Sequence, residues 1–421
     1  MREERNWAGN FRYNAMNWHE PETVEHLQEL VSRCRKLKAL GSRHSFNSIA
    51  DTDGDLISLQ HLDRILELDR ERNTVTIQGG VKYGPLSQEL HRQGYALHNM
   101  ASLPHISVAG ACATATHGSG VGNGNLATAV SALQFIRADG ERVTLSREHN
   151  GDLFPGAVVH LGALGIITQL TLDIRPTFSI RQDLYENLPL SRLESYFEEI
   201  FSSAYSVSLF TDWKGPLINQ VWLKSLVTAE AISPAPRFFT ATRAERPLHP
   251  IKALSAESCN EQMGIVGPWQ ERLPHFRLEY TPSVGDELQS EFFVARENAF
   301  AALHAIHEIS GRIAPVLQIS EVRTIAADDL WMSPCFQRPS VAFHFTWKPD
   351  GAAVEQVLKL LDVRLAAFDA RPHWGKLFTM APERLRSLYP KLPEFQALMR
   401  SHDPDGKFHN AFLDKYLLPQ S

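Results

Sequence analysis

One histidine of this chain lies in a glycine turn, where its ring can reach a bound ligand. The segment Gly41-Ser-Arg-His-Ser45 follows a short apolar run, Leu37–Leu40, that predicts a strand. Glycine permits a tight turn after such a strand, and His44 follows three residues later. The imidazole can therefore contact whatever the turn holds. An ordinary exposed histidine on a surface turn fits the same pattern.

A long stretch without charged side chains could hold an anionic ligand through its backbone. From Gln93 to Ile136 the chain runs 44 residues without Asp, Glu, Lys or Arg. Such runs are usually buried, yet this one is too poor in large apolar residues to span a membrane. Its Gly, Ala, Ser and Thr residues leave backbone N–H groups accessible, and these can cradle a pyrophosphate. A small-residue core loop without a ligand is the alternative.

The glycines of this stretch do not form a dinucleotide-binding fingerprint of the Rossmann type. Gly118-Ser-Gly-Val-Gly-Asn-Gly124 resembles that motif superficially. However, a loop precedes it instead of a strand, and the acidic residue expected about 20 positions later is missing. The sequence therefore predicts a nucleotide cofactor held by another fold.

A glutamate and an arginine project together from a predicted strand in the second half. Gln318–Ile325 alternates, so that Glu321 and Arg323 lie on one face. Apolar residues flank the segment, which favours a strand that is at least partly buried. A surface ion pair is the alternative.

A second alternating strand and one lysine add further polar groups. Val341–Trp347 places His344 and Thr346 on one face and aromatic residues on the other, which favours a polar cavity beside the first face. Lys376 lies in an aromatic-rich turn. A solvent-facing strand side and a lysine that snorkels to the surface are the alternatives.

The elements that must position these groups differ between the halves of the chain. The first half predicts helices at 22–33 and 85–93, and strands at 37–40, 56–59, 75–77, 130–136, 142–145 and 162–174. The second half predicts strands at 206–213, 220–226, 318–325 and 341–347, helices at 296–310 and 352–368, and proline-rich loops between about 233 and 250. We place a boundary at Arg175-Pro176 and expect an α+β second half with a large antiparallel sheet.

Size and composition exclude several classes of protein. At 421 residues the chain is too long for one ordinary core, so two domains are expected. A formal net charge of −6 argues against nucleic-acid binding. No apolar signal segment is visible near the N-terminus, and we expect a cytoplasmic protein without a membrane anchor. The four cysteines are too widely spaced for a metal motif or a disulfide framework and are expected as reduced thiols: Cys34, Cys112, Cys259 and Cys335.

Together these segments resemble the FAD-binding half of the vanillyl-alcohol-oxidase-type (VAO-type) flavoproteins. In that family a glycine loop after the first strands carries a histidine that bonds covalently to the flavin. The chain is similar, over nearly its whole length and in order, to the bacterial alditol oxidases, also called xylitol oxidases. The segments that carry this resemblance are Asn99-Met-Ala-Ser-Leu-Pro-His-Ile-Ser-Val-Ala-Gly110, Thr116-His-Gly-Ser-Gly-Val-Gly-Asn-Gly124, Tyr205-Ser-Val-Ser-Leu-Phe-Thr-Asp-Trp213, Trp269-Gln-Glu-Arg-Leu-Pro-His-Phe-Arg277 and His373-Trp-Gly-Lys376.

The resemblance implies an FAD-binding domain of the VAO type at residues 1–176. It implies a substrate domain at 177–421 whose C-terminal segment packs near the flavin. FAD would be attached covalently through His44. The implied cofactor contacts are Ala39, Leu40, Gly41, Ser42, Arg43, His44, Ser45, Ala101, Ser102, Ser107, Gly110, Thr114, Ala115, Thr116, His117, Ile167 and His373. The implied substrate contacts are Ser102, Gln289, Glu321, Arg323, His344, Thr346 and Lys376.

Two residues depart from the family pattern. Arg43 stands directly before the flavin-bonding histidine, where the alditol oxidases usually have glycine. Cys112 stands where a small residue suffices, and we interpret it as a buried filler.

The activity implied is oxidation of a primary hydroxyl of a linear polyol, such as xylitol or sorbitol, to the aldose, with O₂ reduced to hydrogen peroxide. Arg323 and Lys376 could stabilise alkoxide character on the reacting oxygen. The proton acceptor is open between Lys376 and His344, with Lys376 slightly favoured. We expect a monomer. The alternatives are a sugar-lactone oxidase or dehydrogenase of the same fold and a flavin-free carbohydrate-binding protein.

Overall fold

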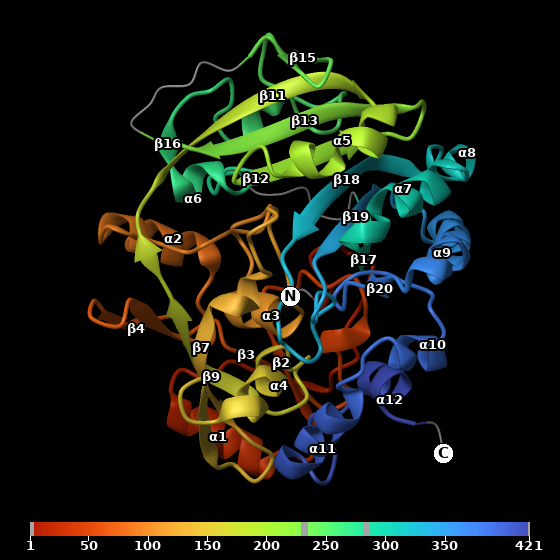
Figure 1. The fold of residues 1–421 in the computed structure, drawn as a ribbon. Helices are drawn as coiled ribbons and strands as arrows, with labels where there is room; N and C mark the ends of the chain where they lie inside the picture. The colour runs from red at the N-terminus through yellow and green to blue at the C-terminus, as the bar shows by residue number, and fades with distance from the viewer. Residues whose placement is uncertain (1–3, 229–234, 281–286, 420–421) are drawn as a thin grey trace.

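The computed structural model describes residues 4–228, 235–280 and 287–419 of the chain. Its two halves lie one above the other, with a large sheet in the upper half and smaller sheets in the lower half (Figure 1). Within the described ranges, no helix combines the length and the apolar character needed to cross a bilayer.

The lower half contains an antiparallel five-stranded sheet in the order β4-β5-β9-β7-β8. Its strands are β4 (Ile65–Asp69), β5 (Thr74–Gln78), β7 (Val130–Ile136), β8 (Arg142–Ser146) and β9 (Ile166–Asp173). A parallel three-stranded sheet, β1-β3-β2, lies beside it and comprises β1 (Asn17–His19), β2 (Leu37–Leu40) and β3 (Asp55–Ser58). A short pair is formed by β6 (Tyr95–Ala96) and β10 (Arg175–Pro176). The helices are α1 (Val24–Arg33), α2 (Tyr83–Arg92), α3 (Val108–Ala113) and α4 (Phe154–Val158).

The upper half is built on a ten-stranded sheet in the order β14-β15-β11-β13-β12-β18-β19-β17-β20, with β16 paired to β11. Its strands are β11 (Ser179–Pro189), β12 (Ser206–Thr211), β13 (Leu217–Leu226), β14 (Arg237–Phe238), β15 (Ala241–Arg243), β16 (Gly267–Pro268), β17 (Leu288–Ala295), β18 (Leu317–Ile325), β19 (Ser340–Trp347) and β20 (Arg371–Pro372). The helices of this half are α5 (Ser191–Phe201), α6 (Trp269–Arg272), α7 (Ala299–His307), α8 (Ser310–Ile313) and α9 (Gly351–Leu365).

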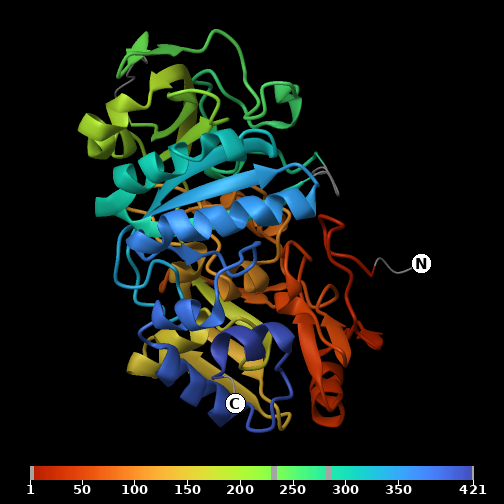
Figure 2. The same cartoon turned by 90° about the vertical axis from the view of Figure 1, so that its right-hand side faces the viewer.

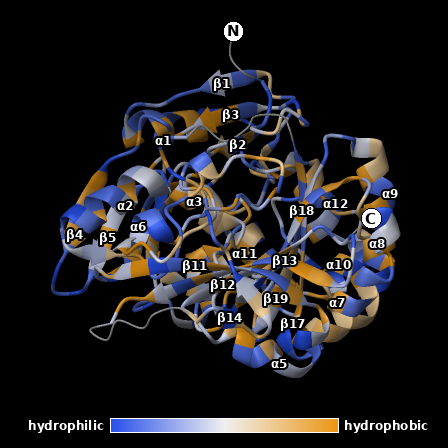
Figure 3. Cartoon of the chain, turned by 90° about the horizontal axis from the view of Figure 1, so that it is seen from above, coloured by the Kyte–Doolittle hydropathy of each residue, from blue (hydrophilic) through white to orange (hydrophobic). Residues whose placement is uncertain are grey.

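The two faces of the large sheet have different partners. One face buries aromatic and aliphatic side chains, such as Phe343, Phe345 and Trp347, against α5, α7 and α9, and Figure 2 shows α9 lying across the strands. The opposite face is turned toward the lower half. Seen from above, hydrophilic residues are prominent at the periphery, around β4 and α2, and hydrophobic ones recur inside (Figure 3). Because side chains alternate along a strand, the large sheet has one apolar face and one polar face.

The C-terminal segment returns to the lower half. It forms α10 (Pro382–Ser387), α11 (Leu392–His402) and α12 (Ala411–Leu417), and the side chains of Phe395 and Phe412 join the hydrophobic core of that half. Asn410 Nδ2 donates to the carbonyl of Asp51 at 2.8 Å. A boundary near residue 176 with a returning C-terminal segment remains our prediction for the domain division.

Most strands and helices predicted from the sequence are present. The strands predicted at 130–136 and 142–145 are β7 and β8, which form an antiparallel hairpin with Leu133 paired to Leu145. The helix predicted at 22–33 is α1, and the Thr23 hydroxyl caps its N-terminus. The predicted helix 296–310 is wrong as a single element, because the chain leaves helical geometry at Ile309 and forms α7 and α8. An additional strand that was not predicted, β4, lies between the predicted strands 56–59 and 75–77. In the proline-rich stretch, β14 and β15 form, and 233–234 lie outside the described residues.

Candidate active site

His44 is held in a strained loop directly after β2. The residue before it, Arg43, has φ of 62°, a left-handed conformation that favours glycine. Neither ring nitrogen of His44 makes a hydrogen bond of standard geometry with the described chain, although both atoms are buried. Burial lowers the pKa of His44 to about 4. The imidazole is therefore neutral at pH 7 and has unpaired nitrogens.

The N-terminal segment covers this loop. The Trp7 ring stacks on the His44 ring, with centroids 5.2 Å apart and planes inclined by 17°. The Trp7 amide donates to the Arg43 carbonyl at 2.8 Å, and Asn6 Nδ2 donates to the Ser45 carbonyl at 2.9 Å. These contacts fix the orientation of the histidine, and sequence reasoning did not identify them.

The loop packs tightly against the neutral stretch. The Ser107 amide donates to Ser42 Oγ at 3.0 Å. A Cβ on Gly41 would lie 2.5 Å from Ser107 Oγ and 4.0 Å from the Gly110 Cα, so a larger residue would displace the Ser107 hydroxyl. Gly41 and Gly110 are nevertheless exposed, and Thr114 close by is only half-buried. Small, uncharged and accessible backbone of this kind fits a pyrophosphate-containing cofactor such as FAD.

Asn47 links the His44 loop to the turn that carries Lys376. Its Nδ2 donates to the carbonyls of Trp374 and Lys376, both at 2.8 Å. The Phe46 amide donates to the Gly375 carbonyl at 2.8 Å. Segments more than 300 residues apart in the chain are thereby joined at one place.

The polar face of the large sheet brings the charged residues together. Glu321 on β18 is paired with His344 on β19, and His344 is paired with Glu291 on β17. One row further along, Thr346 is paired with Gln289. Because side chains two residues apart share a face, all of these groups project toward the lower half.

Arg323 connects this face to the neutral stretch. Its Nη1 donates to Ser102 Oγ at 3.2 Å. Its Nε lies 3.4 Å from Glu321 Oε1, and its Nη2 lies 3.6 Å from Glu291 Oε1. The guanidinium is 6% exposed, so its charge acts in a largely water-free place.

Glu291 is the partner of the second cation. Lys376 Nζ donates to Glu291 Oε2 at 2.8 Å, and His117 Nε2 lies 3.2 Å from Glu291 Oε1. Burial alone would raise the pKa of Glu291, but Lys376 and His117 outweigh it and hold the pKa well below its usual range. Burial lowers the pKa of Lys376, and Glu291 opposes that change.

His344 has a free nitrogen between these ions. Its Nδ1 lies 3.9 Å from Glu321 Oε2, while its buried Nε2 has no hydrogen-bond partner among the described residues. Burial, reinforced by Lys376, lowers the pKa of His344 to about 4. The close partner of Glu321 is His275, whose Nε2 lies 2.7 Å from Glu321 Oε1. His344 is thus a neutral acceptor in the middle of the cluster.

The other residues implied by the resemblance surround this cluster or line the loops beside it. Leu377 donates its amide to the Gln289 carbonyl at 2.9 Å. His373 is buried behind Glu291, whose carbonyl accepts the His373 amide at 3.0 Å, and burial holds the pKa of His373 well below its usual range. The remaining members are partly or fully buried near the neutral stretch and β2: Ala39, Leu40, Ala101, Ala115, Thr116 and Ile167.

Sequence reasoning missed two residues of the charged network, Glu291 and His275. Glu291 follows Gln289 by two positions and interrupts an apolar run that includes Phe292 and Phe293, so a strand reading of 288–295 would have found it. His275 lies in a segment noted only for its resemblance, and no local signal distinguishes it.

Two family models and several known proteins match this chain. Residues 19–146 match the family model described as an FAD binding domain, and residues 286–416 match that of D-arabinono-1,4-lactone oxidase. An alditol oxidase of Streptomyces sp. is 49% identical over 97% of both chains. The L-gulonolactone oxidase of Mus musculus is 27% identical over 97% of both chains.

Solved structures share the fold at low sequence identity. A solvent-stable cholesterol oxidase superposes with a TM-score of 0.79 at 14% identity, covering 98% of this chain and 96% of its own. The carbohydrate oxidase from Microdochium nivale gives a TM-score of 0.75 at 14% identity, covering 99% and 94%. The 49% identity to the Streptomyces enzyme and the match to the FAD binding domain show that the chain belongs to the alditol oxidases, FAD-binding flavoproteins of the VAO type.

Proposed function

We propose that this enzyme oxidises a primary hydroxyl of a linear alditol, such as xylitol or sorbitol, to the aldose. The overall reaction converts R–CH₂OH and O₂ into R–CHO and H₂O₂. The observation that carries the proposal is His344, a neutral buried imidazole whose Nε2 has no partner in the described chain and which lies between two buried cations. FAD, when bound, accepts the hydride and passes the electrons to O₂.

In this proposal His344 accepts the hydroxyl proton. With a pKa of about 4 it is unprotonated at pH 7, while Lys376 already uses its ammonium group in the ion pair with Glu291. The structure therefore favours His344 over Lys376 as the acceptor, the reverse of the order expected from the sequence. Geometry is the first requirement for such a group, and His344 Nε2, which has no partner in the described chain, is available to bond to a substrate hydroxyl.

Arg323 and Lys376 supply positive charge where the substrate oxygen becomes negative. Both side chains are nearly buried, with 6% and 14% exposure. Positioned charges in a water-poor site stabilise a developing oxyanion more strongly than they would in water. The remaining hydroxyls of a linear polyol need partners of their own, since a buried unpaired polar group costs about 1–3 kcal/mol. Gln289 and Thr346 on the polar sheet face, and Ser102 on the neutral stretch opposite, next to Arg323, would provide such partners.

We also propose that FAD is attached covalently through His44. A neutral imidazole with an unpaired ring nitrogen could form an N–C bond to the flavin in place of a C–H bond, with the two electrons released passing through the flavin to O₂. Stacking on Trp7 holds the ring in one orientation. The glycine loop, Ser107 and Gly110 would hold the pyrophosphate. The cytoplasmic location and the monomeric state expected from the sequence remain further parts of this proposal.

The test of attachment is acid precipitation of the purified holoenzyme. The wild-type pellet should keep the flavin, whereas His44→Ala should release it into the supernatant. His105→Ala is the matched control, since His105 is a partly buried histidine nearby that bonds to the Leu278 carbonyl. Flavin that is released entirely from the wild-type protein would refute covalent attachment.

The test of the reaction is oxidation of xylitol with peroxide detection. We expect peroxide formation with xylitol and sorbitol and much lower kcat/KM with sugar lactones. The lactone alternative has a specific basis, because residues 286–416 match the D-arabinono-1,4-lactone oxidase model. Higher kcat/KM with a lactone than with any alditol would favour that alternative.

A further inference from the structure

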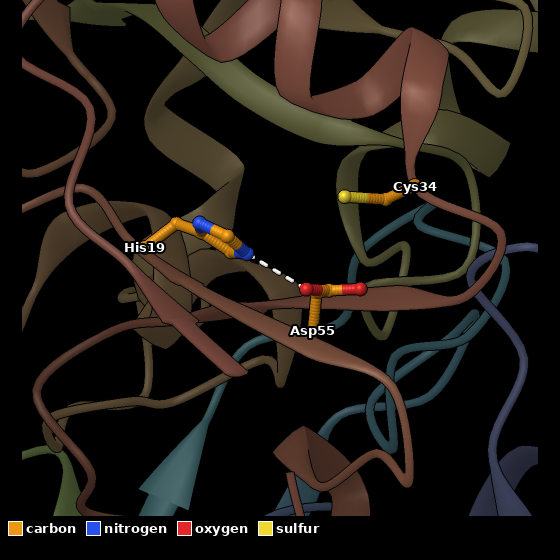
Figure 4. Close-up of side chains that lie close together, drawn as sticks. All are labelled: His19, Cys34 and Asp55. Carbon is orange, nitrogen blue, oxygen red and sulfur yellow. Dashed lines mark hydrogen bonds and ion pairs between the residues drawn. The ribbon is translucent and has the colours of Figure 1, made fainter. Parts of the chain in front are cut away.

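A second cluster of reactive side chains lies away from the charged network, at the edge of the parallel sheet. It comprises His19 at the end of β1, Cys34 directly after α1, and Asp55 at the start of β3. The ligand atoms of all three residues lie within 4.8 Å of one another, and Figure 4 shows the three side chains converging. We propose that these residues bind a divalent metal ion of the zinc type, with water as its fourth ligand.

The local fold explains why the three groups meet. In the parallel pair of β1 and β3, Asn17 is paired with Asp55 and His19 with Ile57, so His19 and Asp55 project from the same face. Their side chains are in contact, with His19 Nε2 and Asp55 Oδ1 2.7 Å apart. Cys34 ends α1, where its amide donates to the Leu30 carbonyl at 3.0 Å. Three separate backbone elements therefore fix the three ligands.

The spacing fits a tetrahedral ion. Zinc binds sulfur, nitrogen and oxygen ligands at about 2.0–2.3 Å, so two ligands of one ion lie roughly 3.3–3.7 Å apart. The His19–Asp55 contact of 2.7 Å has to open by about 0.6 Å, and a separation at the 4.8 Å limit of the cluster would have to shorten by about 1.1 Å. Such shifts are small for side chains that are only partly buried, with exposures of 24% for His19 and 15% for Asp55.

The ligand types select the metal. A thiolate disfavours Mg²⁺ and Ca²⁺, which prefer oxygen, and a carboxylate disfavours Cu⁺, which prefers sulfur. One thiolate, one imidazole and one carboxylate together suit Zn²⁺. A site with three protein ligands leaves the fourth position open to water, and the partial exposure of all three residues gives the ion a path of entry.

Two neighbouring features affect metal binding, namely the proton on the Cys34 thiol and the Arg33 side chain. Burial and the neighbouring Asp55 raise the pKa of the Cys34 thiol, so the metal has to displace a proton. Arg33 lies close to the thiol, but its side chain is 59% exposed and lies 3.7 Å from Glu29. Arg33 can therefore turn toward solvent. A histidine–aspartate pair beside a thiol, without a metal, is the competing interpretation.

Zn²⁺ binding to the complete holoenzyme tests the proposal. After incubation with Zn²⁺ and desalting, we expect one additional equivalent of retained metal and a Tm that rises with Zn²⁺ concentration. With Co²⁺ as a spectroscopic probe, a thiolate-to-metal charge-transfer band should appear in the difference spectrum. Replacing an outer-shell partner of a metal site costs 10–100-fold in affinity. Loss of a direct ligand in Cys34→Ser, Asp55→Asn or His19→Gln should therefore weaken binding at least about 10-fold.

The matched control is His61→Ala. His61 lies 3.7 Å from Glu20 in a histidine–carboxylate pair that is more exposed, at 46% and 30%, and that forms no three-residue cluster with a thiol among the described residues, so this variant should bind Zn²⁺ like the wild type. Flavin content and the metal-free Tm of Cys34→Ser show whether that variant folds. Absence of retained Zn²⁺ in the wild-type enzyme, or unchanged affinity in Cys34→Ser, would overturn the proposal. Because the readout is metal content, the result does not depend on the proposed oxidase reaction.

Discussion

The role of Lys376 is tested most sharply by comparing two variants. One variant lacks the lysine alone, and the other lacks both the lysine and the Glu291 carboxylate. Lys376 has two possible roles, because it faces the substrate region and also neutralises a carboxylate that is 1% exposed. In Lys376→Met, Glu291 keeps Arg323 at 3.6 Å and His117 at 3.2 Å as ion-pair partners. The single variant therefore mixes two effects, and the double variant Lys376→Met/Glu291→Gln separates them.

The expected magnitudes differ for stability and for rate. Breaking a buried ion pair by removing one partner costs about 3–5 kcal/mol, so Lys376→Met should lower the free energy of unfolding by that order. The double variant should recover most of the loss, since no unpaired carboxylate remains. If Lys376 stabilises the developing alkoxide, both variants should reduce flavin roughly 10²–10³-fold more slowly, the usual cost of losing one positioned donor.

Urea denaturation measures the stability of each variant, and anaerobic stopped-flow reduction of the flavin by xylitol measures the rate. Glu291→Gln alone is the control for loss of the carboxylate. Recovery of the wild-type reduction rate in the double variant would refute the alkoxide role and leave Lys376 as the neutraliser of Glu291. A raised KM with unchanged kcat would instead assign Lys376 to substrate binding alone.

Three further predictions concern the residues proposed to bind the polyol, the loop that carries His44, and the stability of the fold at acid pH. Glu321→Ala should weaken polyol binding by about 1–3 kcal/mol, because hydroxyls lose their acceptor; equal turnover of xylitol and ethanol by the wild-type enzyme would contradict a polyol site. Trp7→Ala should reduce the fraction of flavin that stays in the acid pellet and Trp7→Phe should preserve it, while equal fractions in both would contradict a positioning role. Burial lowers the pKa of His160 to about 4, so the unfolded chain binds the extra proton between about pH 6.5 and 4 and the free energy of unfolding falls as the pH falls through that window. His160→Gln should reduce this slope by at most about 1.4 kcal/mol per pH unit in urea titrations, and an unchanged slope would show that His160 does not titrate as proposed.

Local patterns in the sequence were sufficient to predict most of the individual helices and strands named above. Period-two alternation identified β18 and β19 and placed Glu321 with Arg323 and His344 with Thr346, because adjacent side chains of a strand must point to opposite faces. The glycine turn after β2 and the long neutral stretch indicated the cofactor loops. A close approach of the backbone to a phosphate requires small uncharged residues. This requirement can be recognised from the residue types in the sequence alone.

The neighbours of each strand were decided only by the tertiary structure. No local pattern in the β17 sequence predicts that this strand lies beside β19. That pairing places Glu291 between Lys376, His117 and Arg323. The contact of Arg323 with Ser102 spans 221 residues of chain, and its geometry depends on how the polar sheet face meets the neutral stretch.

Two smaller features have the same origin. Trp7 reaches His44 through a return of the N-terminal segment that no periodicity predicts. The break between α7 and α8 arises at Ile309, where the apolar pattern itself continues. The sequence alone thus determined which side chains share a strand face or a turn, since that depends on covalent geometry. Which of those faces and turns meet was determined by long-range packing, because the free energy of such contacts depends on the whole fold.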